Sequence, residues 1–316
     1  MVINDGNIAT KAGLDEIFFQ AYDAEVQPDQ VQATDELFFR QKSTTWGSIQ
    51  NAEFAGSPDF TATSNDEEVP EGSIRIGNKQ TLDVLDFTQD IPFPQSFLED
   101  SEKYEVKMGA VEEMGVSAVN ARDKSAFDNT YGNPFDATNN PTPDGAAVGS
   151  NSHVSLSGET IDNFETGVFN ADNLKILVRV LKLQKRQGGG RGGYFFNGLM
   201  VALNLLETAV EVTDSELKTN TANNNLNWVS NLYPGVKVGT SEYLHSTYNL
   251  LNSNVNTTYA AISRRHKLTR SVRIPIATEW VDPIYDRKRR AFYRGRFRER
   301  SFAGTWSGTA WSDGTV

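Results

Sequence analysis

Four arginines near the C-terminal end of the chain recur at every second position. They are Arg294, Arg296, Arg298 and Arg300. In an extended strand, residues two apart point to the same side, so these side chains would form one row with a spacing of about 7 Å. The residues that would point to the opposite side are Tyr293, Gly295 and Phe297. Guanidinium groups in such a row repel one another unless carboxylates or phosphates lie opposite, so the spacing predicts an anionic partner.

The sequence leaves the identity of that partner open. The segment Arg287–Ser301 holds eight Arg or Lys residues in fifteen positions, although the chain as a whole has a formal net charge of -11. A chain with that overall charge is repelled by phosphate backbones and by anionic membranes, so any contact with DNA must be local. The nearest carboxylates belong to the chain itself or to an identical neighbour. Ion pairs within or between subunits are one interpretation, and direct contact with DNA phosphates is the other.

The other residue types that carry out chemistry do not form a recognisable site. The chain has no cysteine, which excludes disulfides, thiol nucleophiles and cysteine-ligated metals. Its three histidines, His153, His245 and His266, are far apart, and none has a second ligand at helical or strand spacing. No nucleophile elbow or kinase-type motif occurs. We therefore expect neither an enzyme, nor a metal centre, nor a cofactor.

A glycine-rich stretch, "QKRQGGGRGGYFFNG", resembles a phosphate-binding loop only in composition. A phosphate-binding loop follows a strand and opens a helix, and it carries a Lys-Ser/Thr pair. Here the predicted helix comes first and no such pair follows. The stretch therefore predicts a loop that connects a helix to a strand.

Length and composition indicate a globular protein. The 316 residues, 38% of them hydrophobic, suffice for a core in one large or two modest domains. The N-terminus lacks the features of a signal peptide, and no run of eighteen apolar residues occurs. We expect a protein that does not enter membranes and is made in the cytoplasm.

The N-terminal third of the chain predicts two segments that depend on other surfaces. Residues 1–45 carry scattered aromatic side chains between polar stretches and indicate an arm that docks elsewhere; these are Phe18, Phe19, Tyr22, Phe38 and Phe39. Residues 46–92 show strand alternation around an acidic, turn-rich stretch, "SNDEEVPEG", which indicates a long hairpin with a solvated tip. An isolated hairpin is marginal in water, so its apolar residues predict burial against another surface, such as another copy of the chain.

A long helix follows the hairpin. Residues at intervals of three, four or seven mark one face of it, namely Phe97, Tyr104, Met108, Val111, Gly115, Val119, Arg122 and Ala126. About 30 residues at 1.5 Å each give a rod of roughly 45 Å. Such a rod is long enough to organise a thin, flat subunit.

The second half of the chain predicts a compact α/β unit and closing strands. Asn170 or Asp172 would cap a helix whose buried face is Leu174, Leu177, Val178 and Leu181. "GYFFNGLMVAL" reads as a buried strand, and a third helix over residues 204–217 would turn Leu205, Leu206, Ala209 and Val210 inward. From about Val236 the pattern is mainly that of strands, among them the arginine segment.

The order of these parts resembles the major capsid protein of tailed double-stranded DNA viruses, which has the Hong Kong ninety-seven phage fold. Several phrases are similar to the group of the Mu-like major head subunit, among them "KSAFDNTYGNPF", "PDGAAVGSNSH", "ADNLKILVRVLKLQKRQGGGRGGYFFNGLMVALNLLETAVEV", "TANNNLNWVSNLYP" and "FYRGRFRERSFAGTWSGTAWSDG". The resemblance implies an α+β fold divided into an N-terminal arm (1–45), an extended hairpin loop (46–93), a peripheral domain with a spine helix (94–169), an axial α/β domain (170–271) and return strands of the peripheral domain (272–316).

The resemblance also implies a function. The chain would self-assemble into the hexamers and pentamers of an icosahedral shell around packaged double-stranded DNA. Its partners would be copies of itself, a portal, a separate scaffolding protein and, in some particles, a decoration protein, with DNA on the inner face. It would be found in the virion, and in the host cytoplasm during assembly. Two alternatives stay open: a nucleic-acid-binding protein that uses the basic strand Arg287–Arg300, and a subunit of a phage tail or tube.

Overall fold

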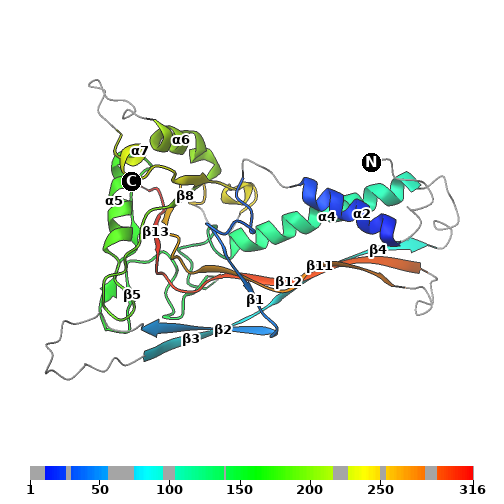
Figure 1. The fold of residues 1–316 in the computed structure, drawn as a ribbon, viewed down its shortest axis with the longest axis horizontal. Helices are drawn as coiled ribbons and strands as arrows, with labels where there is room; N and C mark the ends of the chain where they lie inside the picture. The colour runs from blue at the N-terminus through cyan, green and yellow to red at the C-terminus, as the bar shows by residue number, and fades with distance from the viewer. Residues whose placement is uncertain are drawn as a thin grey trace, which may run out of the picture.

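The computed structural model describes residues 11–25, 30–55, 75–94, 104–138, 140–215, 227–249, 254–281 and 290–315. The acidic hairpin tip, the predicted helix start at Phe97 and the first basic residues of the arginine segment, 287–289, lie outside the described residues. The molecule is elongated, with a long helix and a long sheet at one end and a compact α/β unit at the other (Figure 1). The mixed α+β fold class predicted from the sequence is confirmed.

The long helix α4, Tyr104–Asp128, lies along one face of a four-stranded sheet (Figure 1). Its 25 residues span about 38 Å. The predicted buried face is confirmed at Val111, Gly115, Val119, Arg122 and Ala126. This agreement reflects the helical repeat, which is a local property of the sequence.

The four-stranded sheet has the order β1-β11-β12-β4. Its strands are β1 (Arg40–Ser43), β11 (Leu268–Val281), β12 (Arg290–Ala303) and β4 (Leu85–Pro94). β12 is antiparallel to both of its neighbours, and β1 is a parallel edge strand. The register of β11 shifts around Pro275, as expected for a proline inside a strand.

The predicted hairpin is shorter than the sequence indicated. β2 (Ser48–Ala55) pairs with β3 (Arg75–Asp83) in a separate two-stranded sheet, whereas β4 leaves the hairpin and pairs with β12. The reason is side-chain burial. In β4, Phe87 stacks on Phe297 with ring centroids 4.6 Å apart, and Phe93 is buried.

The predicted arm folds onto its own chain, which corrects the expectation that its aromatic residues dock elsewhere. Helix α2, Lys11–Ala24, buries Leu14, Ile17 and Phe18 against α4 and β12. Phe38 and Phe39 belong to a second buried cluster of the same chain. Gly115 of α4 permits the close contact, because a Cβ atom there would lie 2.6 Å from the backbone oxygen of Phe18.

The compact unit is built on a five-stranded sheet of order β7-β13-β10-β8-β9. Its strands are β7 (Phe164–Glu165), β13 (Thr309–Ser312), β10 (Tyr259–Ile262), β8 (Gly198–Val201) and β9 (Lys237–Gly239). The three central strands are buried throughout, because clusters of apolar side chains cover both faces of the sheet. A small pair, β5 (His153–Val154) and β6 (Thr160–Ile161), lies beside it.

Helix α5, Ala171–Leu183, agrees with the prediction at each stated position. Asn170 caps it by accepting hydrogen bonds from the backbone N–H groups of Asp172 and Asn173, and Leu174, Leu177, Val178 and Leu181 are its buried residues. The first of the two candidate caps is therefore the one used.

The third helix is only partly as predicted. Helix α6, Leu206–Asp214, is preceded by a 3-10 turn at Leu203–Leu205. Ala209 is buried as expected, but the inward placement of Val210 was wrong, because Val210 is exposed and Val212 takes the buried position. The buried residues of α6 are Ala209, Val212 and Thr213, which lie on one face of the helix. The remaining helical segments are α7 (Trp228–Leu232) and a 3-10 turn at Glu242–Leu244.

No helix in the part of the chain that the structure describes has both the length and the apolar character needed to cross a membrane.

Candidate functional site

The predicted two-sided arginine strand is present in β12. Residues 292–300 alternate between half-buried and buried positions. Tyr293 and Phe297 are buried on the side of α2 and α4, and a Cβ atom on Gly295 would lie 3.3 Å from Cε of Met114. The four arginines occupy the other face, as the twofold repeat of a strand requires.

Three of the arginines face carboxylates of the same chain. Arg294 donates to Asp90 through Nε and Nη2, at 2.7 and 2.8 Å. Arg296 donates to Asp86 through the same two nitrogens, both at 3.2 Å, and Arg298 pairs with the same carboxylate. The two aspartates are four residues apart on β4, so their side chains lie on the same face of the sheet. They face the arginine row as a second row of opposite charge.

The electrostatics of the row follow from these contacts. Hydrogen bonds from Arg298 and Arg296 lower the pKa of Asp86, and a hydrogen bond from Arg294 lowers the pKa of Asp90. Side chains of Arg294 and Arg296 are still 37% and 38% exposed. The ion pairs are therefore open to water and to screening by salt.

Arg300 differs from the other three arginines. Its Nη1 donates to the backbone oxygen of Asp83 at 3.4 Å, and its Nε, like that of Arg298, is buried without a hydrogen-bond partner. Burial lowers the pKa of Arg300, although the charge of Asp83 opposes this shift. Within the part of the chain that the structure describes, no carboxylate pairs with this last arginine of the row.

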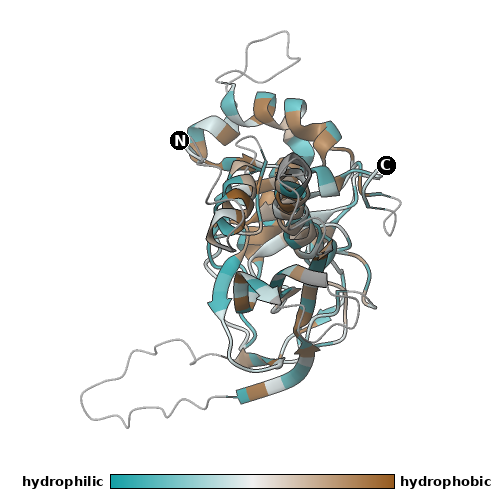
Figure 2. Ribbon diagram, turned by 90° about the vertical axis from the view of Figure 1, so that its right-hand side faces the viewer, coloured by the Kyte–Doolittle hydropathy of each residue, from teal (hydrophilic) through white to brown (hydrophobic). Residues whose placement is uncertain are grey.

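The hairpin presents apolar side chains to solvent. Phe54 of β2 and Ile76 of β3 are cross-strand partners, and they are 54% and 64% exposed. Trp46, just before β2, is 75% exposed. Figure 2 shows the brown band that this apolar content gives to the strand projecting at the lower end of the molecule. Large apolar side chains gathered on a projecting element are typical of an interaction surface.

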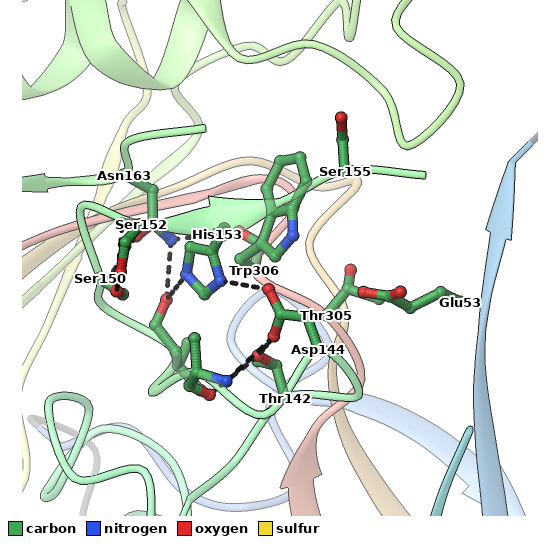
Figure 3. Close-up of polar contacts among 12 residues, drawn as sticks. Glu53, Thr142, Asp144, Ser150, Ser152, His153, Ser155, Asn163, Thr305 and Trp306 are labelled. Carbon is green, nitrogen blue, oxygen red and sulfur yellow. Dashed lines mark hydrogen bonds and ion pairs between the residues drawn. The ribbon is translucent and has the colours of Figure 1, made fainter. Parts of the chain in front are cut away.

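A buried ion pair that sequence reasoning missed lies beside the hairpin strand β2 (Figure 3). His153 is fully buried, with Nδ1 2.8 Å from Oδ2 of Asp144 and Nε2 3.1 Å from the backbone oxygen of Val148. Both partners can accept hydrogen bonds, so the contact is an ion pair when both ring nitrogens carry a proton. The indole of Trp306 stacks on it at 5.6 Å.

Asp144 is the anionic half of this pair. Burial raises its pKa, but hydrogen bonds from His153 and Thr142 and the charge of His153 outweigh burial, and the net pKa lies below its ordinary value. The only signal in the sequence was the phrase "PDGAAVGSNSH", in which both residues fall within a loop without periodicity. The pair closes that loop.

Glu53 of the hairpin strand β2 is buried beside the same site (Figure 3). It accepts a hydrogen bond from Nε2 of Gln187 at 3.2 Å. Burial raises the pKa of Glu53, and the nearby charge of Asp144 raises it further. A titratable group of the hairpin is thus held against the body of the chain.

The remaining histidines, His245 and His266, take no part in the contacts of His153 with Asp144 and Val148. His266 is buried, and burial lowers its pKa to about 4. Within the described residues, no group of three or more His, Asp or Glu side chains could hold a metal ion.

The comparisons with known proteins add evidence on the fold. Neither a protein-family model nor a curated protein matches the chain. Among solved structures, the capsid of an empty GTA particle covers 100% of both chains, with a TM-score of 0.53 and 11% identity. A chain of Mycobacterium phage Adephagia has a TM-score of 0.51 at 13% identity and covers 92% of both chains. The capsid of a native GTA particle also has a TM-score of 0.51, at 10% identity, over 92% of this chain and 94% of that one. The chain therefore has the α+β capsid fold of the Hong Kong ninety-seven type.

Proposed function

We propose that the chain is a major capsid protein, which self-assembles into the hexamers and pentamers of an icosahedral shell around packaged double-stranded DNA. In this role it catalyses no reaction. It resides in the virion, and in the host cytoplasm during assembly. Its partners are other copies of itself, a portal, a separate scaffolding protein and, where present, a decoration protein.

The observation that carries the proposal is the match to a capsid chain over the full length of both chains. The match thus includes every described element, from α2 to β13, and the matched chain comes from a capsid particle. The elongated outline of the molecule suits a subunit that contacts several neighbours (Figure 1). Modest contacts repeated over a closed lattice give collective stability without any tight pair.

The hairpin provides a second argument. Phe54 and Ile76 remain exposed after the chain has folded, whereas the rest of the large apolar side chains are mostly buried. A surface of this kind gains free energy when it is covered, at roughly 25 cal/mol for each Å² of apolar area removed from water. A neighbouring copy in the shell would cover it.

The nucleic-acid-binding alternative is less well supported. Three of the four arginines on which it depended are paired with Asp86 and Asp90. A DNA backbone would have to displace these carboxylates. The strand can still face a neighbouring subunit or DNA in the assembled particle, through the parts of its guanidinium groups that stay exposed.

Electron microscopy of the purified protein, alone and with a scaffolding protein, tests the proposal. We expect closed particles with angular facets. Tubes or rings would favour a tail or tube subunit, and a monomer under all conditions would contradict the proposal.

A pair of hairpin variants sharpens the test. Phe54→Ser with Ile76→Ser should abolish closed particles while leaving the circular dichroism spectrum and the melting temperature of the monomer unchanged. Phe54→Leu with Ile76→Val keeps the surface apolar and should still assemble. Equal assembly of both variants would remove the hairpin from the proposed contact.

A further inference from the structure

Several basic side chains lie at the β1 edge of the four-stranded sheet, opposite the edge formed by β4. Arg40 and Lys42 are two residues apart on the edge strand β1, where their register partners are Thr269 and Ser271 of β11. They therefore share one face of the sheet. Lys267 immediately precedes β11, and the charges of Arg40 and Lys42 act on it. Among the described residues, neither Lys42 nor Lys267 forms an ion pair with a carboxylate.

A hollow of about 320 Å³ lies next to these residues, and we call it the basic hollow. Its walls come from four parts of the chain: the hairpin strand β2, the glycine-rich segment after α5, the edge of the long sheet, and the turn after β12. It is lined by Lys42, Asn51, Ala52, Phe54, Arg186, Gln187, Tyr194, Lys267, Thr269, Gly304, Thr305 and Ser307.

The charges around the basic hollow are almost all of one sign. Lys42, Arg186 and Lys267 line it, and no Asp or Glu is among the described residues of the lining. Arg186 and Arg265 both act electrostatically on the hydroxyl of Tyr194. The nearest acid of β2 is Glu53, which is directed to Gln187 and whose pKa is raised by burial.

A second acidic residue, Glu36, lies in a neighbouring hollow that shares Lys42 with the basic hollow. Glu36 lines the neighbouring hollow, together with Arg40, Lys42 and Arg264, so cations outnumber it there as well. Burial, Arg40 and Lys42 together lower the pKa of Lys267, as expected where like charges lie close and no anion compensates them.

Hydroxyl groups complete the lining. The hydroxyl oxygen of Thr305 accepts the backbone N–H of Ser307 at 3.3 Å, so its own proton is left for another acceptor. Cations and the Thr305 hydroxyl beside one hollow suit an oxyanion with several acceptor oxygens.

We propose that the basic hollow binds a phosphate group, either as free inorganic phosphate or as part of a nucleic-acid backbone. Lys42 and Lys267 together carry two positive charges, which matches the charge of about -1.5 to -2 on free phosphate at neutral pH. A phosphodiester of a nucleic-acid backbone carries a single negative charge but is followed by further phosphates along the strand. The volume lies at the lower end of the range of small-molecule sites. The site is separate from the arginine row on β12, where Arg294, Arg296 and Arg298 pair with aspartates of β4.

Binding of inorganic phosphate to the full chain tests the site. The melting temperature is measured against phosphate concentration, with sodium chloride at equal ionic strength as the reference. Phosphate also stabilises proteins without binding to a site, so the comparison is between variants. Lys42→Gln with Lys267→Gln removes two lining cations. Lys175→Gln with Arg179→Gln removes two exposed cations of α5 and is the matched control.

We expect a saturable rise in melting temperature for the wild type and for the control, because a ligand that binds only the folded state stabilises it. The Lys42 and Lys267 variant should bind phosphate at least about tenfold more weakly, the effect of losing charge-assisted hydrogen bonds. Equal responses of all three proteins, or no saturation in any of them, would overturn the proposal.

A second arm distinguishes the sources of the phosphate. A duplex oligonucleotide that competes with phosphate for the wild type but not for the Lys42 and Lys267 variant identifies the nucleic-acid backbone as the ligand. Phosphate binding without such competition identifies a free anion. A poly-glutamate peptide that binds while phosphate does not would assign the hollow to an acidic protein segment and contradict the proposal.

Discussion

Asp86 of β4 lies directly opposite Arg298 of β12 in the antiparallel register, and its carboxylate pairs with that arginine. It also accepts both hydrogen bonds from Arg296. One carboxylate thus pairs with two cations of the row, and Asp90 pairs with a third, Arg294. The anionic partner that the arginine spacing demanded is present inside the folded chain.

The first prediction concerns this shared carboxylate. Asp86→Asn should leave Arg296 and Arg298 without a counter-charge and so increase the affinity of the chain for duplex DNA at low salt. The slope of log K against log salt should steepen by about one for each arginine released. Fluorescence anisotropy with a labelled duplex measures both quantities.

Glu207→Gln is the control for that experiment, since it removes one exposed negative charge far from the row. If both variants bind DNA equally, net charge explains the effect and the pairing at Asp86 does not restrain the arginines.

The second prediction concerns the pH dependence of Glu53. Its pKa in the folded chain is raised above 4.5, so the folded state holds the proton more tightly than the unfolded state does. The stabilisation is complete below about pH 4.5 and is lost as the pH rises through the folded pKa. Glu53→Gln keeps the shape and cannot ionise, so its advantage in free energy of unfolding over the wild type should grow between pH 4.5 and 7.

Urea unfolding at several pH values measures this difference. Glu211→Gln, an exposed glutamate of α6, serves as the control and should show no such growth. A constant difference between Glu53→Gln and the wild type across that range would mean that Glu53 ionises as freely in the folded chain as in the unfolded one.

The third prediction concerns the buried pair of His153 and Asp144. His153→Gln removes the imidazole that pairs with Asp144 and leaves this carboxylate buried with one partner fewer, which should lower the free energy of unfolding by about 3–5 kcal/mol. Adding Asp144→Asn to that variant removes the unpaired charge, so the double variant should lose less than the sum of the two single losses. Urea denaturation of all four proteins gives the coupling, and strict additivity would refute an ion pair at this position.

The fourth prediction separates an arm packed on its own chain from one that folds only on a neighbour. Phe18 of α2 is fully buried, whereas Phe19 is 36% exposed. Phe18→Ala should destabilise the unassembled monomer by about 3–5 kcal/mol, the usual effect of truncating a buried phenylalanine. Phe19→Ala should have a much smaller effect. If both substitutions leave the stability of the monomer unchanged, α2 does not pack on α4 before assembly.

The sequence determined the features that repeat over a few residues. The helical period placed Leu174, Leu177 and Leu181 on the buried face of α5, and the cap residue Asn170 marked its start. The twofold period placed the four arginines of β12 on one face. These patterns are local, because each residue's direction depends on the backbone of its own segment. The order of the segments also indicated the capsid fold, which the solved structures support.

The tertiary structure decided which distant residues meet. Asp90 faces Arg294 across 204 positions of sequence, and Asp86 faces Arg296 across 210. The sequence could demand carboxylates there but could not select these two. Pairing of β4 with β12 depends on tertiary contacts, namely the stacking of Phe87 on Phe297 and the burial of Phe93. The same holds for α2, which packs on its own chain because Gly115 leaves room for its backbone, and for the His153–Asp144 pair, which lies in a loop that no periodicity describes.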